Sequence, residues 1–587
     1  MFKLIKNFKK EDWLIIIVSI ALIVMQVWLE LKMPDYMSKV TVLVQTEGSK
    51  MSEILKNGGF MLLCAFGSLV GAVIVGYLIA LLASGFSRNL RSKLFRKVED
   101  MSMSEIKEFS PNSLITRTTN DITQVEMFIG FGLQLLIKAP VTAVWAITKI
   151  LNKSWEWSMV TAVAVVVLLV VIGILTIIVM PKFKIVQKLT DKLNGVTREN
   201  LTGIRVVRAF NAEEYQQEKF QDVNNSLTNL QLFNQKTMSI MAPVMYLVMY
   251  MLTLVIYFIG AYLIKDALMA DKIGLFGDMV VFSSYAMQII MSFLMLAMIF
   301  MILPRAQVSA SRINEVLDTS VSVIDGKVTN KGEVGTIEFK NVSFKYPDAE
   351  EYVLKNISFK ANKGDTVAFI GSTGSGKSTL VNLIVRFYDV TDGEILIDGV
   401  NIKDYKLEYL YKLIGYVPQR AVLFNGTVNS NISYGEAMEK ISDKKIVEAS
   451  KVAQADEFIS KMDDGYESHI AQGGTNVSGG QKQRLAIARA IAKNPEIYIF
   501  DDSFSALDYK TDAVLRSELK KYTKDATSLI VAQRIGTIMN ADKIIVLDNG
   551  ESVGVGTHEE LLKSCEVYKQ IALSQLSKEE LDNAKTK

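Results

Sequence analysis

Apolar residues dominate the first half of the chain, where they form long runs separated by polar segments. A helix needs about 20 apolar residues to cross about 30 Å of hydrocarbon, and each run is close to that length. After Ser311 no comparable run occurs. The pattern therefore predicts six membrane-spanning helices followed by a soluble half. The apolar runs lie at residues 13–31, 59–83, 128–148, 157–180, 240–264 and 279–303.

From Ile337 onward the pattern changes to short strands, turns and helices. Residues 337–344 alternate between apolar and polar side chains, as a half-buried strand does. Short apolar runs at 367–370, 413–417, 496–500 and 544–547 are typical of buried strands. We therefore expect a membrane domain at 1–310, a linker at 311–336, an α/β domain at 337–575 and a polar tail at 576–587.

Two polar segments inside the membrane half, 84–127 and 181–239, favour helix and are poor in proline. They predict membrane helices that continue into the cytoplasm and turn there. Each carries a short patch at its expected turn, Ser113–Asp121 and Gly203–Phe210. Both patches could be solvated loops, but Phe210 at an exposed tip would be costly unless it docks on another surface.

Charge fixes the expected orientation and excludes some classes of protein. Clusters of Lys and Arg lie before the first apolar run and after the second, fourth and sixth. Because basic residues concentrate on the cytoplasmic side, we expect a multi-pass protein of the cell membrane with both termini in the cytoplasm. The chain has 65 basic and 62 acidic residues, a balance that does not indicate nucleic-acid binding. Its two cysteines provide no disulfide framework or zinc site.

Two features of the membrane half have more than one interpretation. Lys138 lies inside the third apolar run, where it could line a translocation path or extend its ammonium to the inner interface. The last two runs are rich in Met and contain Tyr246, Tyr250, Tyr257 and Tyr285. Thioethers and amphipathic rings suit varied apolar ligands, although such residues serve equally in helix packing or lipid contact.

A phosphate-binding motif of the form G-x-x-x-x-G-K-[ST] lies between the strand at 367–370 and a helix expected at 379–387. Its glycines let the backbone aim several N–H groups at phosphates, and the positive end of the helix attracts the same anions. The Lys ammonium would reach the β- and γ-phosphates, and the Ser hydroxyl would hold Mg²⁺. The residues expected to bind the nucleotide are Gly371, Ser372, Thr373, Gly374, Ser375, Gly376, Lys377, Ser378 and Thr379.

Further residues could complete the nucleotide site. Tyr346 lies ahead of the loop, where its ring could stack on a purine, and Gln419 offers a neutral oxygen for Mg²⁺ or the attacking water. Asp501 ends a buried strand and could hold the hydrated Mg²⁺. A second glycine-rich turn opens another helix and is a second phosphate-binding device, whose expected ligand is a nucleotide held by another subunit. That turn consists of Ser478, Gly479, Gly480 and Gln481.

With these motifs the chain resembles a half-transporter of the ATP-binding cassette (ABC) exporter family, of the six-span multidrug and lipid type. The resemblance covers essentially the whole chain. It implies an α-helical six-span transmembrane domain fused to an α/β P-loop nucleotide-binding domain, with ATP and Mg²⁺ as cofactors. It also implies that 371–379 is the Walker A loop, that 478–481 is the signature presented across a head-to-tail dimer, and that the two polar patches are coupling helices. In the same way Tyr346 would stack on adenine, Gln419 would be the Q-loop glutamine and Asp501 the Walker B aspartate.

The chain departs from this family at the catalytic centre. Asp502 stands where the family usually has a Glu that acts as general base or positions the water, and Gln533 stands where a switch histidine is expected. The missing methylene withdraws the carboxylate by about 1.5 Å, and a misplacement of about 1 Å can cost on the order of 10²-fold in rate. Tolerated drift would explain these changes. Two losses beside an intact signature favour instead a heterodimer, in which the partner carries the Glu and the His.

The expected function is ATP-driven export of amphiphilic or hydrophobic compounds, with this chain supplying a slow ATP site and a competent signature. The expected partners are a second half-transporter, membrane lipid and a small amphiphilic substrate, and no nucleic acid. Six spans exclude a chromosome-maintenance or translation ATPase. Export of lipids or peptides stays open, as does an ATP-binding membrane sensor that transports nothing.

Overall fold

The computed structural model describes residues 2–151, 154–268, 271–329 and 334–575, and the chain divides into two compact units. The first, which we call the membrane unit, contains Met1–Lys97 and Asn112–Asp318. The second, the nucleotide unit, contains Val98–Pro111 and Thr319–Lys587. The polar tail predicted at 576–587 lies outside the described residues.

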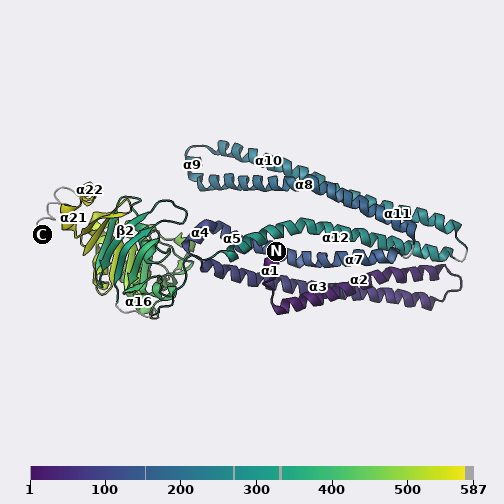
Figure 1. Ribbon diagram of the computed structural model, residues 1–587, viewed down its shortest axis with the longest axis horizontal. Helices are drawn as coiled ribbons and strands as arrows, with labels where there is room; N and C mark the ends of the chain where they lie inside the picture. Colours follow the sequence, from purple (N-terminus) through teal and green to yellow (C-terminus); the bar gives the residue numbers. More distant parts are fainter. Residues whose placement is uncertain (1, 152–153, 269–270, 330–333, 576–587) are drawn as a thin grey trace. The chain divides into compact units, whose positions relative to one another are not determined.

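Among the described residues, the membrane unit contains six helical segments that are long and apolar enough to cross a membrane, which confirms the predicted number. In Figure 1, α12 lies along α7, while α8 and α10 run side by side and α9 joins them at one end. The helices are α1 (Phe2–Ile5), α2 (Lys10–Gln45), α3 (Met51–Glu99), α5 (Pro111–Thr116), α6 (Ile122–Met127), α7 (Leu133–Leu151), α8 (Trp155–Thr202), α9 (Ile204–Ala209), α10 (Glu213–Ser239), α11 (Met241–Asp266) and α12 (Lys272–Asp318). Two π-helical turns, η1 (Arg117–Asp121) and η2 (Phe128–Gly132), join α5, α6 and α7 into one segment.

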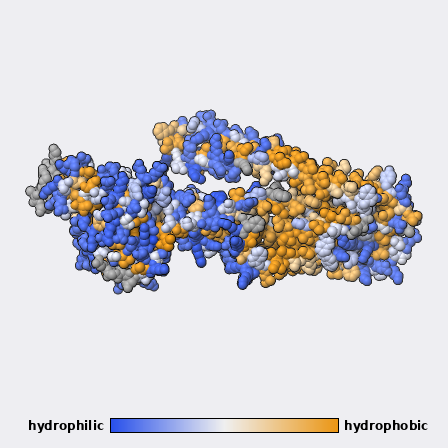
Figure 2. Space-filling view, in the orientation of Figure 1, coloured by the Kyte–Doolittle hydropathy of each residue, from blue (hydrophilic) through white to orange (hydrophobic). Residues whose placement is uncertain are grey.

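The surface of this unit has the distribution expected of a bilayer protein. Hydrophobic residues gather along the membrane helices, whereas the far ends of α8 and α10 are mostly hydrophilic (Figure 2). The far ends of α8 and α10 are the predicted extensions of the spans, and the chain turns between them at α9, as expected. At that turn Val206 and Phe210 stay largely exposed.

Lysines of α7 are paired with acids of α2 in the membrane unit. The ammonium of Lys138 lies 2.9 Å from Glu30 Oε1, which also accepts hydrogen bonds from Gln26 and Ser68. Neither interpretation of Lys138 from sequence included this partner. The pair satisfies both charges where the bilayer offers no water to do so.

A second pair lies further along the same two helices. Lys149 Nζ is 2.8 Å from Asp35 Oδ2. The buried hydroxyl of Tyr285 donates to Asp35 Oδ1 at 2.6 Å and also lies 2.9 Å from the carbonyl oxygen of Leu31. These contacts join α2 to both α7 and α12. Around them lies an apolar core that includes Ile23, Val27, Trp157 and Phe282.

The prediction that Ser113–Asp121 forms a turn is wrong. This stretch lies within the helical run from α5 to α6, and Arg117 and Asp121 are buried. Arg117 donates to Glu315 Oε2 at 2.6 Å and to the carbonyl of Arg312 at 2.7 Å, and Arg312 lies 3.3 Å from Asp121. The polar side chains therefore face partners on α12, almost 200 residues further along the chain.

The turn after α3 occurs earlier, at residues 100–102, and leads into the short helix α4 (Met103–Phe109), which packs with the nucleotide unit. Glu105 caps this helix through the backbone N–H of Ser102 at 2.7 Å and accepts a hydrogen bond from the backbone of Ser322 at 3.3 Å. Lys107 forms an ion pair with Asp348 at 2.9 Å. This segment of the first extension is itself part of the nucleotide unit.

The nucleotide unit is built on a six-stranded sheet of order β12-β11-β3-β10-β9-β6, in which all the strands except β12 are parallel. A four-stranded antiparallel sheet of order β2-β1-β4-β5 packs with it through a shared apolar core. The strands are β1 (Ile337–Phe344), β2 (Leu354–Ala361), β3 (Thr366–Gly371), β4 (Asp392–Ile397), β5 (Val400–Asn401), β6 (Ile414–Val417), β7 (Gly426–Thr427), β8 (His469–Ile470), β9 (Ile497–Asp501), β10 (Thr527–Val531), β11 (Lys543–Asp548) and β12 (Glu551–Gly556).

Helices surround these sheets and complete the predicted α/β class. They are α13 (Lys377–Ile384), α14 (Leu407–Leu413), α15 (Val428–Ile432), α16 (Asp443–Val452), α17 (Asp456–Ile459), α18 (Gly479–Ala492), α19 (Tyr509–Tyr522), α20 (Ile535–Ile538), α21 (His558–Ser564) and α22 (Glu566–Gln575). The boundary predicted at residue 310 falls inside α12, which continues to Asp318 because Ile313 and Val316 remain fully buried.

Removal of one member of the Glu30–Lys138 pair should destabilise the membrane unit. Glu30→Ala leaves an uncompensated ammonium among apolar helices, so we expect a loss of about 3–5 kcal/mol. Replacement of both residues, Glu30→Leu with Lys138→Met, should cost much less because no charge is left alone. The midpoint of thermal unfolding in detergent measures both. Lys3→Ala is the control, since its pair with Asp318 is exposed to solvent. A Glu30→Ala protein as stable as the wild type would contradict this account.

Candidate nucleotide site

The phosphate loop connects the end of β3 to the start of α13. Two of its glycines are required by the backbone. Gly376 has φ +95°, a conformation that L side chains rarely adopt, and a Cβ there would lie 2.6 Å from Leu354 Cδ2. A Cβ on Gly371 would collide with the carbonyl oxygen of Leu547. The loop is therefore held tightly against β11, with the N-terminus of α13 open to an anion.

Lys377 reaches back across this loop. Its ammonium donates to the carbonyl oxygens of Gly371 at 2.9 Å and Ser372 at 2.7 Å, and lies 3.2 Å from Ser375 Oγ. Burial lowers the pKa of Lys377, while Asp502 and Asp501 act in the opposite direction. The ammonium thus occupies the centre of the loop, where it can pair with a phosphate.

The carboxylates come from the end of β9, a strand buried along its whole length. Ser378 Oγ donates to Asp501 Oδ1 at 3.1 Å, which brings together two of the predicted metal ligands. Burial raises the pKa of both Asp501 and Asp502, and at Asp501 the neighbouring Asp502 carboxylate adds to this rise. Both acids therefore favour a nearby cation, which would hold them ionised.

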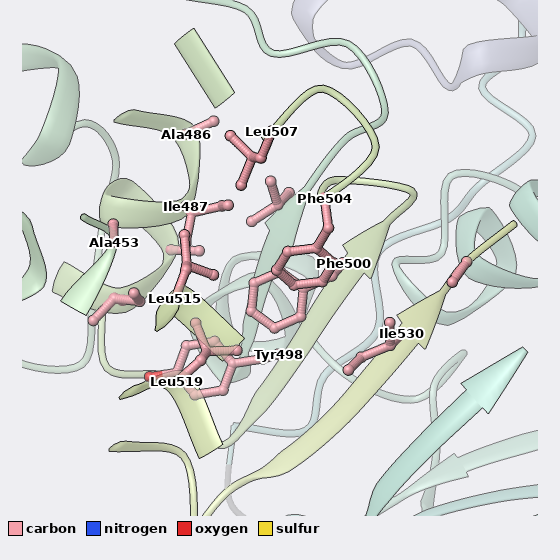
Figure 3. Close-up of a cluster of buried hydrophobic side chains, with 14 of the residues drawn as sticks. Ala453, Ala486, Ile487, Tyr498, Phe500, Phe504, Leu507, Leu515, Leu519 and Ile530 are labelled. Carbon is pink, nitrogen blue, oxygen red and sulfur yellow. The ribbon is translucent and has the colours of Figure 1, made fainter. Parts of the chain in front are cut away.

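An aromatic core fixes where β9 ends. Phe500 lies against Phe504, with ring centroids 5.4 Å apart, and Tyr498 is 6.1 Å from Phe500. Figure 3 shows these rings beside Leu515 and Leu519, which come from α19. Because residues on both sides of Asp501 and Asp502 are anchored in this core, the two carboxylates have little freedom to move.

Asp502 is held by two glutamine side chains. Gln533 Nε2 donates to its Oδ2 at 2.8 Å, and Gln419 Nε2 lies 3.4 Å from the same oxygen. The backbone of Asp502 has φ +46°, in the left-handed region that Asp tolerates better than most residues. The structure therefore brings together all the residues predicted around the catalytic centre: Lys377, Ser378, Gln419, Asp501, Asp502 and Gln533.

Tyr346 lies beside the loop helix. Its hydroxyl is 3.1 Å from Thr379 Oγ1, and its ring meets those of Phe344 and Tyr388 edge to face, with centroids 5.0 Å and 5.3 Å away. Lys107 Nζ of α4 lies 5.6 Å from the ring centroid. Sequence reasoning missed this contact, because no local pattern links residue 107 to residue 346.

The second glycine-rich turn caps α18. Ser478 Oγ accepts a hydrogen bond from the backbone of Gln481 at 3.3 Å, and Gln481 Oε1 accepts one from the backbone of Ser478 at 2.8 Å. Ser478 and Gly479 are exposed, and a Cβ on Gly479 would meet no atom within 4 Å. Within the described part of the chain, no hydrogen bond or ion pair links this turn to the phosphate loop. The turn is thus free to face another molecule.

The oxygen donors at the site suit a hard cation. Among the described residues no cluster of three or more His, Cys, Asp or Glu side chains could hold a metal alone. Ser378, Asp501 and Gln419 supply a hydroxyl, a carboxylate and an amide, a set that fits Mg²⁺, which takes its other ligands from water and phosphate. The assignment of these three residues as metal ligands stays a prediction.

Comparisons with known proteins agree with this arrangement. The chain matches the family models described as ABC transporter transmembrane region over residues 13–293 and ABC transporter over residues 354–505. An ABC transporter ATP-binding protein of Mycobacterium bovis is 40% identical over 521 residues, which cover 88% of this chain and 87% of that protein. An ATP-dependent lipid A-core flippase of Pseudomonas aeruginosa is 33% identical over 497 residues, which cover 84% and 80%.

A solved structure of a bacterial Atm1-family ABC exporter with ATP bound shares the fold. Its TM-score is 0.81 at 24% identity, and the match covers 96% of this chain and 99% of that one. The chain therefore belongs to the ABC transporter family. It is a multi-pass membrane protein with the exporter fold, which binds ATP and couples its hydrolysis to transport.

Replacement of Lys377 should weaken ATP binding more than replacement of Tyr346. Lys377→Ala removes a charge that pairs with phosphate. Tyr346→Ala removes a stacking surface and the hydrogen bond to Thr379 but no charge, and charge-assisted contacts are the stronger. Photolabelling of this chain with an azido-ATP measures both variants. Lys363→Ala, a change at an exposed lysine of the same unit, serves as control. Unchanged labelling in both site variants would exclude this loop as the ATP site.

Proposed function

We propose that this chain is one half of a heterodimeric exporter whose own ATP site hydrolyses slowly. The observation that carries the proposal is the hydrogen bond from Gln533 Nε2 to Asp502 Oδ2 at 2.8 Å. A catalytic carboxylate must orient the attacking water or take its proton. Here the shorter side chain is withdrawn from the nucleotide by about 1.5 Å relative to Glu, and one of its oxygens is already engaged by an amide.

Gln533 also differs chemically from the histidine that the family resemblance implies. An imidazole can gain a proton near neutral pH and carry positive charge, whereas an amide cannot. The amide can only donate its hydrogens to a neighbour, which it does to Asp502. Both changes lower the capacity of this centre to move a proton or to stabilise charge.

The residues expected to bind the nucleotide favour a site that keeps ATP bound. The loop around Lys377 and the ring of Tyr346 would hold ATP, and Ser378, Asp501 and Gln419 would hold Mg²⁺. The ion would neutralise charge on the phosphates. ATP binding without rapid turnover is therefore the state that this set of residues favours.

The signature residues support the second half of the proposal. Exporters of this type work as dimers, and Ser478 and Gly479 lie exposed at the N-terminus of α18. Their backbone N–H groups can meet a γ-phosphate held by a partner chain. A partner with Glu and His at the positions of Asp502 and Gln533 would then possess the active site of the pair.

For cargo we propose amphiphilic or hydrophobic compounds, moved out of the cell by a protein whose termini both lie in the cytoplasm. The basic flanks of the spans support this orientation. A second candidate is a lipid, since the relatives from Pseudomonas aeruginosa and Haemophilus influenzae are named lipid A-core flippases. ATP-dependent movement of labelled amphiphile or lipid in proteoliposomes tests both. A protein that binds ATP but moves neither would be a sensor.

Two substitutions in this chain should have opposite effects on the steady-state ATPase activity of the assembled pair. Asp502→Ala should leave most of the activity, because little hydrolysis passes through this site. Ser478→Arg should abolish most of it, because the new side chain obstructs the partner's γ-phosphate. Phosphate release from the purified pair measures both. An Asp502→Ala loss as large as that of Ser478→Arg would make this an ordinary working site.

The exposed α9 tip generates a further prediction. Phe210 is 79% exposed at the end of the α8–α10 hairpin, and we expect it to dock on a nucleotide unit of the dimer. Phe210→Asp would place a charge in that apolar contact. ATPase activity should persist while transport falls, or the pair should fail to assemble. Tyr215→Asp, on exposed α10 nearby in sequence, is the control. Normal transport by Phe210→Asp would show that the tip is merely solvated.

A further inference from the structure

The backbone that carries Gln533 lies between two elements, β10 and α20. The pairing of β10 with β3 and β9 ends at Val531, so Gln533 lies beyond the paired strand. The helix α20 then begins at Ile535, and its N-cap residue Arg534 forms no side-chain capping bond. Because the first N–H groups of a helix have no partner within it, this short stretch needs a contact from elsewhere in the chain. We call Gln533–Ile535 the switch segment.

That contact comes from Gln575 in the last turn of α22, 40 residues after Ile535. Gln575 Oε1 accepts a hydrogen bond from the backbone N–H of Ile535 at 2.8 Å. Gln575 Nε2 donates to the backbone carbonyl of Gln533, also at 2.8 Å. One side-chain amide therefore binds a donor and an acceptor of the switch segment, as a neighbouring strand would.

The packing of α22 fixes the place from which Gln575 reaches the switch segment. Tyr568 and Ala572 of this helix are fully buried in the apolar core of the nucleotide unit. The Tyr568 hydroxyl also lies 2.7 Å from His558 Nδ1 on α21. Tyr568, Ala572 and Gln575 occupy positions i, i+4 and i+7, which share one face of a helix. The core thus holds the face of α22 that presents Gln575.

This contact concerns ATP because the Gln533 side chain holds Asp502. Its Nε2 donates to Asp502 Oδ2 at 2.8 Å, while Gln575 holds the backbone from which that amide projects. An ionised carboxylate that was free to turn toward the phosphates of ATP would repel them. A loss of the Gln575 contacts should therefore weaken the hold on ATP through Gln533.

We propose that Gln575 is a positioning residue of the nucleotide site, which keeps Gln533 against Asp502 and so slows the release of ATP. Gln575 acts through the switch segment rather than on the nucleotide. The inference rests on the proposed retention of ATP at this site, and it adds a residue of α22 that maintains this retention.

The test follows the ATP held by this chain alone. The full-length chain, with any partner that it retains, is purified into lipid nanodiscs and loaded with azido-ATP that is radiolabelled at the α-phosphate. An excess of unlabelled ATP is added, and irradiation at intervals attaches the remaining label to this chain, which a gel separates from its partner. The variants are Gln575→Ala, Gln575→Glu, Gln533→Ala and the combination of Gln533→Ala with Gln575→Ala. The control Gln570→Ala makes the same chemical change at an exposed position of α22.

We expect Gln575→Ala to release ATP roughly three- to tenfold faster than the wild type, which corresponds to the loss of one hydrogen bond. Gln533→Ala should have an effect of the same size. The double variant should release ATP no faster than either single variant, because both changes break the same series of contacts. Gln570→Ala should behave as the wild type does.

The Gln575→Glu variant separates positioning from helix capping. A carboxylate at this position still accepts the N–H of Ile535, and so caps α20, but it cannot donate to the carbonyl of Gln533. If Gln575 positions Gln533, the Glu variant should release ATP as fast as the Ala variant. A general loss of stability would not produce this pattern.

Three results would overturn the inference. One is release at the wild-type rate from Gln575→Ala. Another is a Gln575→Glu variant that matches the wild type, which would reduce Gln575 to a cap of α20. The third is an additive effect in the double variant, which would show that Gln575 acts by a route other than Gln533. Recovery of the bound label mainly as ADP would instead contradict the proposed slow site, while the release rates would still decide the role of Gln575.

Discussion

In the nucleotide unit, the contacts of Asp502 depend on the parallel pairing of β3, β10, β9 and β6. The register of β9 on β10 places Asp501 opposite Val531, and the backbone N–H of Asp502 donates to the carbonyl of Val531 at 3.0 Å. Gln533 lies two residues after Val531, so this register also brings its side chain to the Asp502 carboxylate. The aromatic core behind β9 holds this register, since slippage by one residue would move Tyr498 and Phe500 to the opposite face of the sheet, where Ile497 and Ile499 now pack. The chemistry of the site thus follows from strand pairing before it depends on any single side chain.

The membrane unit is subject to a different constraint, because lipid cannot satisfy a charge or a backbone group. The unit supplies Lys138 and Lys149 each with an acid on α2, and Tyr285 adds a hydrogen bond to Asp35. These contacts fix the position of α2 relative to α7 and α12. The stability of the helix bundle therefore depends on a few polar side chains.

Features encoded locally could be predicted from the sequence. The period-2 pattern of residues 337–344 matches β1, and the glycine motif correctly placed a loop between β3 and α13, although the helix begins at Lys377 rather than Thr379. Long-range partners could not be predicted. Arg117 and Asp121 have the composition of a solvated turn, but α12 provides their partners. Lys138 is tolerated among apolar helices because it pairs with Glu30, 108 residues away. The presence of an acid at the end of the first apolar run could have indicated this partner.

The attachment of α4 to the nucleotide unit makes that unit discontinuous in the chain. Lys107 and Asp348 are 241 positions apart, and Met101 and Phe109 are buried. During synthesis, the segment from Val98 to Pro111 emerges long before the strands against which it packs, so it must wait while four more membrane helices are made. A fragment that starts at Thr319 would lack it altogether. The nucleotide unit therefore completes its contacts only after all the membrane helices have been synthesised. Its folding must follow the synthesis of the membrane unit.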